Sequence, residues 1–527
     1  MIGEIPDLIA KRAELAPRAV ALEEAATGRT RTYAELDARA TAAAAMLDGH
    51  GVGAGDRVAI LCRNRIEYFE LLFACARLGA IFVPLNWRMP PGELDGLIAD
   101  CAPVLLFHGA GDAEAVSRLA AAIPAICLDD DYERLLVAVA PAHTRRHWQA
   151  EATWDLIYTS GTTGQPKGVV YTYRMALANY VNIGSATGLR GSDTTVAFLP
   201  NFHTAGINLH ALPVLIAGGR VIVLESFDAD AIVALLAAER LDTLFAVPTV
   251  YQALLDHPDF AVLPLSRVRH WGCGGAPLPD ILVERYRALG VRVCNGMGMT
   301  ETGPTAFLVD PADAWDRIGS VGKPQLLCSA RIVDGDGREV AEGAVGDLQF
   351  AGPGVTPGYW RNEEATRAAF TADGWLRSGD LARRDSDGFY WIAGRRKEMF
   401  ISGGENVYPV EVENVLAAHP AVVDVAVLGR PDPKWGEVGR AFVQLAPDRH
   451  LDCAELDAFC RARLAAYKVP VSFEFVTEFP PEELFPPGLE NATGRLEVMV
   501  RRRKDMDYVD ISGEITNEPP PSRVMAA

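Results

Sequence analysis

Apolar and polar positions along the first half of the chain alternate with the periods of buried strands and amphipathic helices. Residues 58–61 are a continuous apolar run that predicts a strand, residues 67–78 predict a helix ended by Gly79, and residues 80–83 predict the next strand. The pattern returns at residues 221–224, 232–241, 243–247 and 250–255. Strand, helix and strand at this spacing predict parallel α/β units.

The pattern changes toward the C-terminus. Near the N-terminus, Thr32 and Glu35 are predicted to form a capping box that opens an alanine-rich helix. Beyond Gly346, by contrast, the sequence is rich in Gly, Pro and Trp and predicts turns. Residues 425–428 and 441–445 then predict strands of a smaller α+β unit. From Arg501 a basic cluster gives way to an acidic, Pro-containing tail, for which we expect mobility.

Length and charge limit the classes of protein. A chain of 527 residues exceeds a single hydrophobic core and predicts about three or four domain-sized units. The net charge of −19 argues against an extended nucleic-acid surface, while a local basic pocket for phosphates remains compatible with it. We therefore expect no nucleic-acid partner.

The sequence favours a cytoplasmic location. Residues 1–7 have neither the basic start nor the apolar run of a secretory signal, and no stretch approaches the ~20 apolar residues of a membrane helix. The nine cysteines are scattered without a C-x-x-C pair, which is typical of reduced, buried thiols. We expect no integral membrane segment.

Residues 158–169, Tyr-Thr-Ser-Gly-Thr-Thr-Gly-Gln-Pro-Lys-Gly-Val, have the composition of a phosphate-binding loop. The stretch lies between two apolar runs, so a loop between strands is predicted. Its glycines allow the backbone to approach an anion, and the exposed amides and the hydroxyls of Ser160, Thr162 and Thr163 can donate to phosphate oxygens. Lys167 adds a point charge. A flexible turn is the alternative, since clusters of Gly, Ser and Thr are usually turns.

The sequence lacks the motifs of three common classes of active site. The loop is not a Walker loop, because Gly161 and Gly164 lie too close together and no Gly-Lys-Ser/Thr follows. No G-x-S-x-G of a serine hydrolase occurs. Gly296-Met297-Gly298 is no dinucleotide fingerprint, because Glu301 stands where the third glycine belongs.

The order of motifs resembles the acyl-adenylate-forming (AMP-binding) superfamily, which includes acyl- and aryl-CoA synthetases, peptide-synthetase adenylation domains and luciferases. The loop resembles its phosphate-binding signature. Four later segments resemble its adenine turn, its adenine and metal support, its ribose site, and its hinge with the following loop; these are residues 274–277, 295–301, 375–380, and 394–398 with 403–407. The resemblance covers about residues 1 to 500 and is highly specific as a set.

The resemblance implies a reaction and its ligands. An acid and Mg-ATP give an acyl-adenylate and pyrophosphate, and a thiol, commonly of CoA, then attacks the activated carbonyl after a small domain rotates. ATP, Mg²⁺ and CoA are thus the expected cofactors and co-substrates. The expected nucleotide- and CoA-contacting residues are Thr159, Ser160, Gly161, Thr162, Thr163, Gly164, Gly274, Gly275, Ala276, Pro277, Asn295, Gly296, Met297, Gly298, Asp380, Arg395, Lys397, Gly403 and Gly404.

The resemblance also assigns roles within this set. Glu301 is the expected Mg²⁺ ligand, and Thr300, Thr162 and Lys167 face phosphate, because phosphoryl and nucleotidyl transfer depend on positioning and charge neutralisation. Asp380 is expected to accept hydrogen bonds from the ribose hydroxyls, as an ionised carboxylate can. Without the surrounding motifs, Thr300, Glu301 and Asp380 would be interpreted as helix-capping, turn or solvated surface residues.

Hinge and thiol delivery are the remaining roles. Arg395 is expected to reach the ribose or the phosphates, and Lys397 lies where the family swivels its C-terminal domain. Gly403 and Gly404 are expected to line a narrow path for the thiol, although two adjacent glycines also make an ordinary turn.

The acid pocket is expected around an aromatic-His element. Asn201-Phe202-His203-Thr204-Ala205-Gly206 resembles the family's segment at the pocket mouth, where His203 would gate the pocket or approach the carboxylate; a structural histidine is the alternative. Bulky Trp and Met side chains favour a compact, aromatic acid over a long fatty chain, although core packing explains them equally well. The predicted lining is Phe202, His203, Gly206, Trp271, Gly272, Cys273, Met297 and Met299.

Two positions depart from the family pattern. Met297 stands where an aromatic residue is expected, and methionine can still pack on a base. The family's Thr-Gly-Lys, whose lysine stabilises the adenylation transition state, reads Thr493-Gly494-Arg495 here, after residues 481–490 that look inserted. Arginine keeps the charge with a different geometry. Arg495 doing the same work is favoured; a substitute charge from residues 501–504, or an unusual reaction, are the alternatives.

The sequence as a whole predicts an ATP-dependent ligase of the acyl- or aryl-CoA synthetase class. An adenylating enzyme with a non-CoA outcome (an amide synthetase or a nitrite-using diazotase) and a silent nucleotide-binding regulator are the alternatives. The expected organisation is a large, multi-subdomain N-terminal α/β domain (1–396), a small mobile C-terminal α+β domain (397–503) and a flexible tail (504–527). The active site should lie in the cleft between the domains. The acid, the acceptor and the oligomeric state, with a homodimer as one option, stay open.

Overall fold

A six-stranded, mostly parallel sheet near the N-terminus holds the hairpin that flanks the phosphate loop. The computed structural model describes residues 3–137, 147–159, 166–402, 405–432, 434–446 and 449–477. The sheet has the order β10-β9-β5-β4-β6-β7, and β10 alone runs antiparallel, to β9. Its strands are β4 (Arg57–Leu61), β5 (Ile81–Pro84), β6 (Leu105–His108), β7 (Ala125–Cys127), β9 (Thr153–Thr159) and β10 (Lys167–Thr172).

Two helices of this region have the end signals that the sequence predicts. Thr32 caps α2 with the predicted capping box to Glu35, and Gly79 ends α3 in the left-handed conformation with φ 74°. The helices are α1 (Leu8–Leu15), α2 (Tyr33–Gly49), α3 (Ile66–Leu78), α4 (Pro91–Cys101), α5 (Ala113–Ser117) and α6 (Tyr132–Val137), and two short strands, β1 (Glu4–Pro6) and β8 (His147–Gln149), pair nearby.

Two further sheets follow; two of the three strand pairs in the first and two of the four in the second are parallel. The first has the order β11-β12-β2-β3 and the second β13-β14-β15-β16-β17. Their strands are β2 (Val20–Glu24), β3 (Thr30–Thr32), β11 (Thr194–Ala197), β12 (Arg220–Val223), β13 (Thr243–Ala246), β14 (His270–Cys273), β15 (Val293–Met299), β16 (Gly303–Leu308) and β17 (Lys323–Pro324). Their helices are α7 (Tyr173–Thr187), a π-helix η2 (Ala205–Leu209), α8 (Ala211–Ala217), α9 (Ala229–Ala237), α10 (Pro248–Asp256) and α11 (Asp280–Ala288).

The region beyond Gly346, expected to consist of turns, contains an antiparallel sheet instead. Its order is β18-β19-β20-β21, with strands β18 (Ser329–Val333), β19 (Gly346–Ala351), β20 (Leu376–Arg384) and β21 (Tyr390–Arg395) and a short helix, α12 (Glu363–Ala369). The predicted turns connect strands. Polar and glycine residues in these strands interrupt the alternation of apolar and polar positions that would have predicted them. The predicted ribose segment therefore lies on a strand.

The last described part of the chain is a smaller α+β unit. Strands β22 (Phe400–Ser402), β23 (Glu405–Val407), β24 (Val422–Asp432), β25 (Gly436–Leu445) and β26 (Ser472–Val476) form one sheet. Helices α13 (Pro409–Ala417) and α14 (Cys453–Arg461) share a hydrophobic core with it. The predicted α/β class with a smaller C-terminal α+β unit is confirmed, whereas the boundary at Arg396/Lys397 and the mobility of the unit stay predictions.

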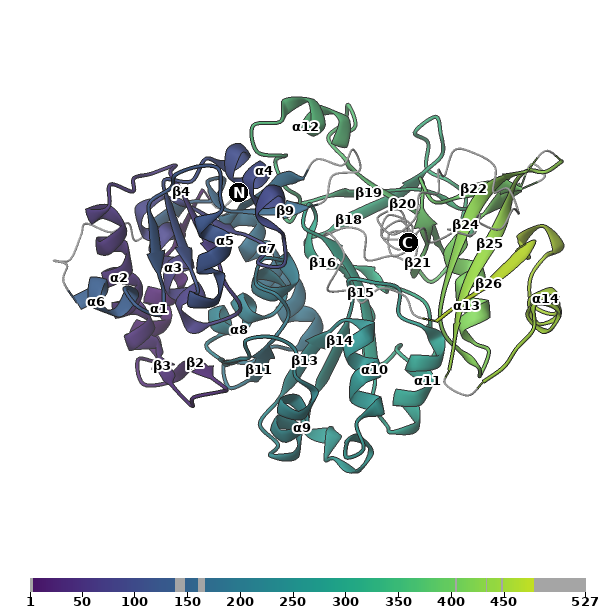
Figure 1. The fold of residues 1–527 in the computed structure, drawn as a ribbon, viewed down its shortest axis with the longest axis horizontal. Helices are drawn as coiled ribbons and strands as arrows, with labels where there is room; N and C mark the ends of the chain where they lie inside the picture. The colour runs from purple at the N-terminus through teal and green to yellow at the C-terminus, as the bar shows by residue number, and fades with distance from the viewer. Residues whose placement is uncertain are drawn as a thin grey trace, which may run out of the picture.

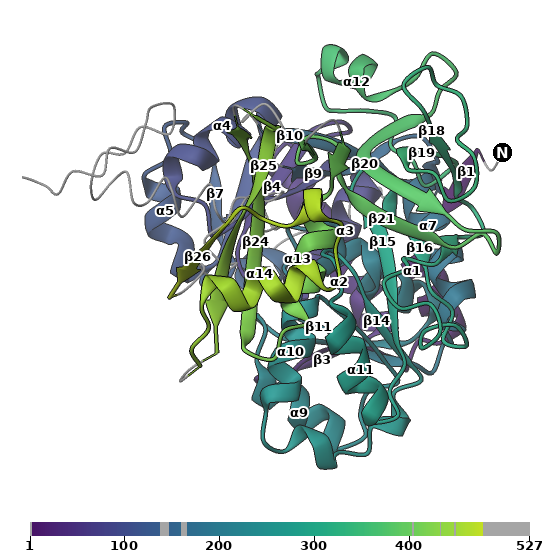
Figure 2. The same ribbon diagram turned by 90° about the vertical axis from the view of Figure 1, so that its right-hand side faces the viewer.

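The arrangement brings the site segments toward the middle of the molecule. In Figure 1 the six-stranded sheet lies to the left, the C-terminal sheet to the right, and the strands β15, β16 and β18 to β20 between them. Turning the molecule brings the C-terminal sheet and α14 to the front (Figure 2). No helix of the described ranges is long and apolar enough to span a membrane.

Candidate active site

Thr159 and Lys167 mark the two ends of the phosphate loop. They close β9 and open β10, and they are paired across the hairpin. Ser160, Gly161, Thr162, Thr163 and Gly164 lie outside the described residues. The hairpin confirms that the predicted loop connects two strands, and its register brings both ends of the loop to one edge of the sheet.

Tyr359, which the sequence analysis missed, joins Lys167 to Glu301. The Lys167 Nζ lies 5.2 Å from the centre of the Tyr359 ring, and the Tyr359 hydroxyl donates to Glu301 Oε1 at 3.0 Å. Burial, followed by the Glu301 charge, raises the pKa of the tyrosine, so its hydroxyl stays a donor. The segment before it is anchored too, since Thr356 N donates to the Glu301 carbonyl at 2.8 Å. Pro-Gly-Tyr-Trp in the sequence was the available signal.

Glu301 is a buried carboxylate positioned for a cation. It is 8 % exposed, and Thr300 beside it is 9 % exposed, in the turn between β15 and β16. Mg²⁺ in nucleotide sites is typically held by one or two carboxylates together with substrate phosphates. Among the described residues no group of three or more His, Cys, Asp and Glu could hold a metal by itself. Glu301 with the phosphates of a nucleotide is the arrangement that fits.

Asp380 is buried and keeps one carboxylate oxygen unpaired. Its Oδ1 accepts from Arg395 Nε at 2.8 Å, and its backbone N–H donates to the Ser378 hydroxyl at 3.0 Å. Oδ2 has no partner among the described residues although the residue is only 4 % exposed. Burial raises the pKa of Asp380 to about 6, Arg395 opposes this shift, and the Glu301 charge adds to it. An orphaned acceptor of this kind fits a ligand that brings hydroxyl donors.

Close backbone packing explains the glycines of the predicted adenine region. A Cβ on Gly298 would lie 2.1 Å from the Pro304 carbonyl oxygen, and one on Gly296 would lie 2.9 Å from that of Phe307. Gly274 packs against Gly296 in the same way, and Gly275 has φ 86°. Nearby, the Asn295 amide donates to the Ser320 carbonyl at 3.0 Å, and Met297 packs at the edge of the core below β18–β21. Ala276 and Pro277 follow β14 in an irregular segment.

His203 lies among aromatic and basic side chains. Its ring is 4.5 Å from that of Phe202, which meets Trp87 edge-on at 6.4 Å. Although part of the residue is exposed, burial of the ring and then the Arg88 guanidinium lower the pKa of His203 to about 4, so it is neutral at physiological pH. Gly206 must be glycine here, because a Cβ would lie 2.2 Å from the Pro200 carbonyl oxygen. Arg88, which the sequence analysis did not single out, faces this element.

Strand alternation separates the other predicted pocket residues. Trp271 and Cys273 point to one face of β14 and pack in the hydrophobic core with Tyr251 and Tyr286, which favours the alternative of core packing; their place in the acid pocket stays a prediction. Gly272 belongs to the opposite face. A Cβ on Gly272 would lie 2.3 Å from carbon atoms of the Phe245 ring, so this ring occupies the space that a side chain would need. Met299 ends β15 next to Thr300 and is partly exposed.

The hinge is anchored on its N-terminal side. The Arg396 guanidinium makes a two-armed ion pair with Asp347 on β19, and the backbone N–H of Arg396 donates to the Gly379 carbonyl at 3.0 Å. Lys397, next along the chain, is exposed. The predicted thiol-path residues Gly403 and Gly404, and Arg495 with its flanking segments, lie outside the described residues.

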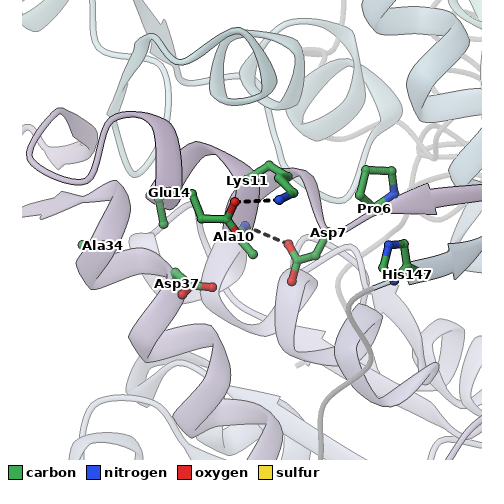
Figure 3. A pocket seen from close by; sticks show the side chains of 9 residues that line it. Pro6, Asp7, Ala10, Lys11, Glu14, Ala34, Asp37 and His147 are labelled. Carbon is green, nitrogen blue, oxygen red and sulfur yellow. Dashed lines mark hydrogen bonds and ion pairs between the residues drawn. The ribbon is translucent and has the colours of Figure 1, made fainter.

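One surface pocket of the described chain lies away from these residues. It has a volume of about 500 Å³ and lies at the N-terminal helix, between α1 and α2 (Figure 3). Asp7 in its wall caps α1 through the Ala10 N–H and pairs with buried Arg77. These are structural tasks, and the pocket holds none of the predicted site residues. All nine cysteines are described and none forms a disulfide.

Comparison with known proteins places the chain in a family. The profile of the AMP-binding enzyme family matches residues 9–360, and that of the AMP-binding enzyme C-terminal domain matches residues 411–483. The chain belongs to the AMP-binding enzyme family.

Several similar proteins are acid–CoA ligases. The chain is 41% identical to a feruloyl-CoA synthase of an Amycolatopsis species over 89% of this chain and 94% of the relative. It is 37% identical to an indoleacetate–CoA ligase of Aromatoleum aromaticum over 90% and 95%. Among solved structures, o-succinylbenzoate CoA synthetase of Bacillus subtilis in complex with its acyl-adenylate intermediate has a TM-score of 0.82 at 32% identity, covering 92% of this chain and 96% of that one. The same enzyme has been solved with ATP and a magnesium ion.

Proposed function

We propose that this chain is an ATP-dependent acid–CoA ligase whose acid carries an aromatic ring. The protein is an AMP-forming ligase that joins an acid to CoA through an acyl-adenylate, with ATP and Mg²⁺ as the activating pair. The observation that carries the site assignment is the buried pair Glu301 and Asp380, in which Asp380 keeps an unpaired oxygen. The aromatic acid is favoured by the identity to the feruloyl and indoleacetate ligases.

In the first half-reaction, the negative charges of the acid and of the ATP phosphates come together near described residues that can stabilise them. A carboxylate oxygen attacks the α-phosphorus of ATP, the bond to the bridging oxygen breaks, and pyrophosphate leaves. Lys167 and Tyr359 lie beside Glu301 at the edge where the phosphates are expected. When bound, Mg²⁺ neutralises phosphate charge, so that an anionic acid can approach. Asp380 and Arg395 hold the ribose and keep the α-phosphate at a fixed distance from the acid.

The second half-reaction transfers the acyl group. The CoA thiol, as thiolate, attacks the carbonyl carbon, and AMP leaves with its phosphate carrying the former carboxylate oxygen. We propose that His203 and Arg88 lie at the entrance used by the acid or the thiol, since a neutral imidazole and a guanidinium meet there. Arg495 in place of the family's lysine, the boundary at Arg396/Lys397, a cytoplasmic location and a homodimer remain our proposals from the sequence.

A product panel tests this function. The purified chain is incubated with Mg-ATP and ferulate, indoleacetate, a long-chain fatty acid, or nitrite with an aryl amine, each with and without CoA. We expect AMP and pyrophosphate with the aryl acids, and their CoA thioesters at a kcat/KM at least about tenfold above that of the fatty acid. Products that form without CoA would point to the amide-forming or diazotase alternatives. ATP binding without any turnover would point to the silent regulator.

A further inference from the structure

Two buried histidines behind the predicted nucleotide region have ring nitrogens without a hydrogen-bond partner among the described residues. His210 is 5 % exposed and caps α8, and His270 is 2 % exposed and opens β14. His210 Nε2 lies 2.8 Å from the Thr243 hydroxyl, but His210 Nδ1 and both ring nitrogens of His270 have no hydrogen-bond partner among the described residues. Buried polar atoms are nearly always paired, so three on adjacent imidazoles require an explanation.

The strand register puts both rings on the face of the sheet that leads to the adenine segment. Thr243 is paired with His270, and Phe245 is paired with Gly272 across β13 and β14, so these four share one face. Gly274 follows the last residue of β14, four residues after His270, and packs against Gly296. The distance from His270 to Gly274 is about 13 Å at the usual rise of a strand. An aryl acid with a short side chain could span it with its carboxylate at the nucleotide end.

The surface between the two ends is apolar. Phe245 lies near both imidazoles, since its ring centre is 6.0 Å from that of His210 and 6.5 Å from that of His270. It belongs to a small hydrophobic cluster formed by Ile183, Leu209, Phe245, Cys294, Leu308, Val309 and Ala314. These residues come from α7, η2, the strands β13, β15 and β16, and the segment that follows β16. The face therefore offers an apolar middle for a ring and a polar far end.

The histidines can act as neutral hydrogen-bonding groups. Burial lowers the pKa of His210 to about 4 and that of His270 to about 3, with His210 and Arg269 adding to the shift at His270. A neutral imidazole offers one N–H donor and one acceptor nitrogen. Behind them, Asp193 is fully engaged by Arg269 at 2.6 Å and does not compete for these atoms. A phenolic hydroxyl, which both donates and accepts, matches this pair.

We propose that His210 and His270 form the polar end of the acid pocket and hydrogen-bond a hydroxyl substituent on the ring of the aryl acid. The ring lies against the Phe245 cluster, and the substituent reaches the imidazoles past the edge of Phe245. This assignment rests on the proposed function and refines it to a ring-hydroxylated aryl acid. Phe245 and the two histidines are specificity-determining residues in this arrangement.

The test compares one acid with and without its ring hydroxyl. Wild-type protein and the variants His270→Phe, His210→Phe and His270→Gln are assayed by pyrophosphate release with ferulate and with the same acid lacking the hydroxyl. Trp271→Phe is the matched control, because it alters the neighbouring residue of β14 on the opposite face. Thermal unfolding of each variant establishes that it is folded.

We expect the wild type to prefer the hydroxylated acid by about tenfold or more in kcat/KM. Either His→Phe change should remove most of that preference, mainly by raising KM for the hydroxylated acid, and should leave the acid without hydroxyl within about threefold. His270→Gln, which keeps a donor and an acceptor, should retain part of the preference, and Trp271→Phe all of it. An unchanged preference in the folded His→Phe variants, or equal losses for both acids, would overturn the assignment while leaving the ligase function intact. Absence of pyrophosphate release with every acid would overturn both.

Discussion

A carboxylate inside a protein keeps its charge only when neighbouring groups compensate for the lost water, and Asp380 meets this problem beside a second acid, Glu301. Arg395 supplies one compensating contact, and the remaining unpaired oxygen is left for a ligand. The result is an acid whose pKa is raised to about 6 in the protein without nucleotide. At the scale of single residues, nucleotide binding and proton release are therefore linked at this position.

The linkage predicts a pH dependence of ATP binding. Protonation of Asp380 stabilises the folded protein below the ordinary pKa of aspartate, and this contribution is lost as the pH rises through about 6. The ribose requires the ionised form, so KM for ATP should be flat above pH 7 and rise about tenfold for each unit below 6. Initial rates at saturating acid measure it. Asp380→Asn should have a raised KM at all pH values without this step; an identical step in the variant would assign the titration to another group.

Residue types near the site could be predicted from the sequence to different extents. Glu301, Asp380 and Lys167 lie in motifs whose order alone indicated nucleotide chemistry, and the structure brings them near one another. Tyr359 was missed because its partners are 58 residues and more away along the chain, so the local Pro-Gly-Tyr-Trp segment marks the residue without showing what it contacts. His210 and His270 were missed because a single histidine among apolar residues is usually structural.

At the scale of elements, backbone contact between neighbouring strands shapes the nucleotide region. β15 and β16 approach each other so closely at Gly298 that a methyl group would overlap the Pro304 carbonyl. Parallel strands, helices and caps were predictable because their periodicity and end signals are local. The antiparallel sheet β18–β21 was not, since its alternation is interrupted by glycines that serve turns and bulges, such as Gly379 with φ 81°.

The close approach predicts opposite outcomes for two glycine substitutions. Gly298→Ala should lower the free energy of unfolding by about 1–3 kcal/mol or more, and the thermal midpoint with it, because the Pro304 carbonyl is part of the backbone and cannot move aside. Gly96→Ala, inside α4 with nothing within 4 Å of the new methyl, should raise stability by up to about 1 kcal/mol. Thermal unfolding followed by circular dichroism compares them. Equal shifts in both variants would show that Gly298 tolerates a side chain and that the described packing is wrong there.

At the scale of the whole molecule, the C-terminal unit is joined to the rest just after two anchored arginines. Arg395 and Arg396 are held by Asp380 and Asp347 on the preceding sheet, whereas Lys397 is exposed. A rotation of the C-terminal unit, as the family resemblance implies, would then turn about the backbone after Arg396. The sequence suggested this position from its motif, and the anchoring contacts supply a physical reason for it.

A proline at this position should uncouple the two half-reactions. Lys397→Pro fixes φ near −65° and restricts the residue before it, so a required rotation would be hindered. Acid-dependent pyrophosphate release in a single turnover should stay within about threefold of wild type, while thioester formation should fall by about tenfold or more. Rapid quench with and without CoA measures both, with Lys397→Ala as the control. Equal loss of both steps, or of neither, would remove Lys397 from the hinge.

The central claim is that the acid itself attacks the α-phosphate and leaves an oxygen atom on AMP. Ferulate labelled with ¹⁸O in its carboxylate, incubated with the protein, Mg-ATP and CoA, tests this directly by mass spectrometry of the nucleotide product. The account predicts AMP that carries one ¹⁸O atom for each thioester formed, together with unlabelled pyrophosphate. Unlabelled AMP, or label in inorganic phosphate alongside ADP, would contradict activation through an acyl-adenylate.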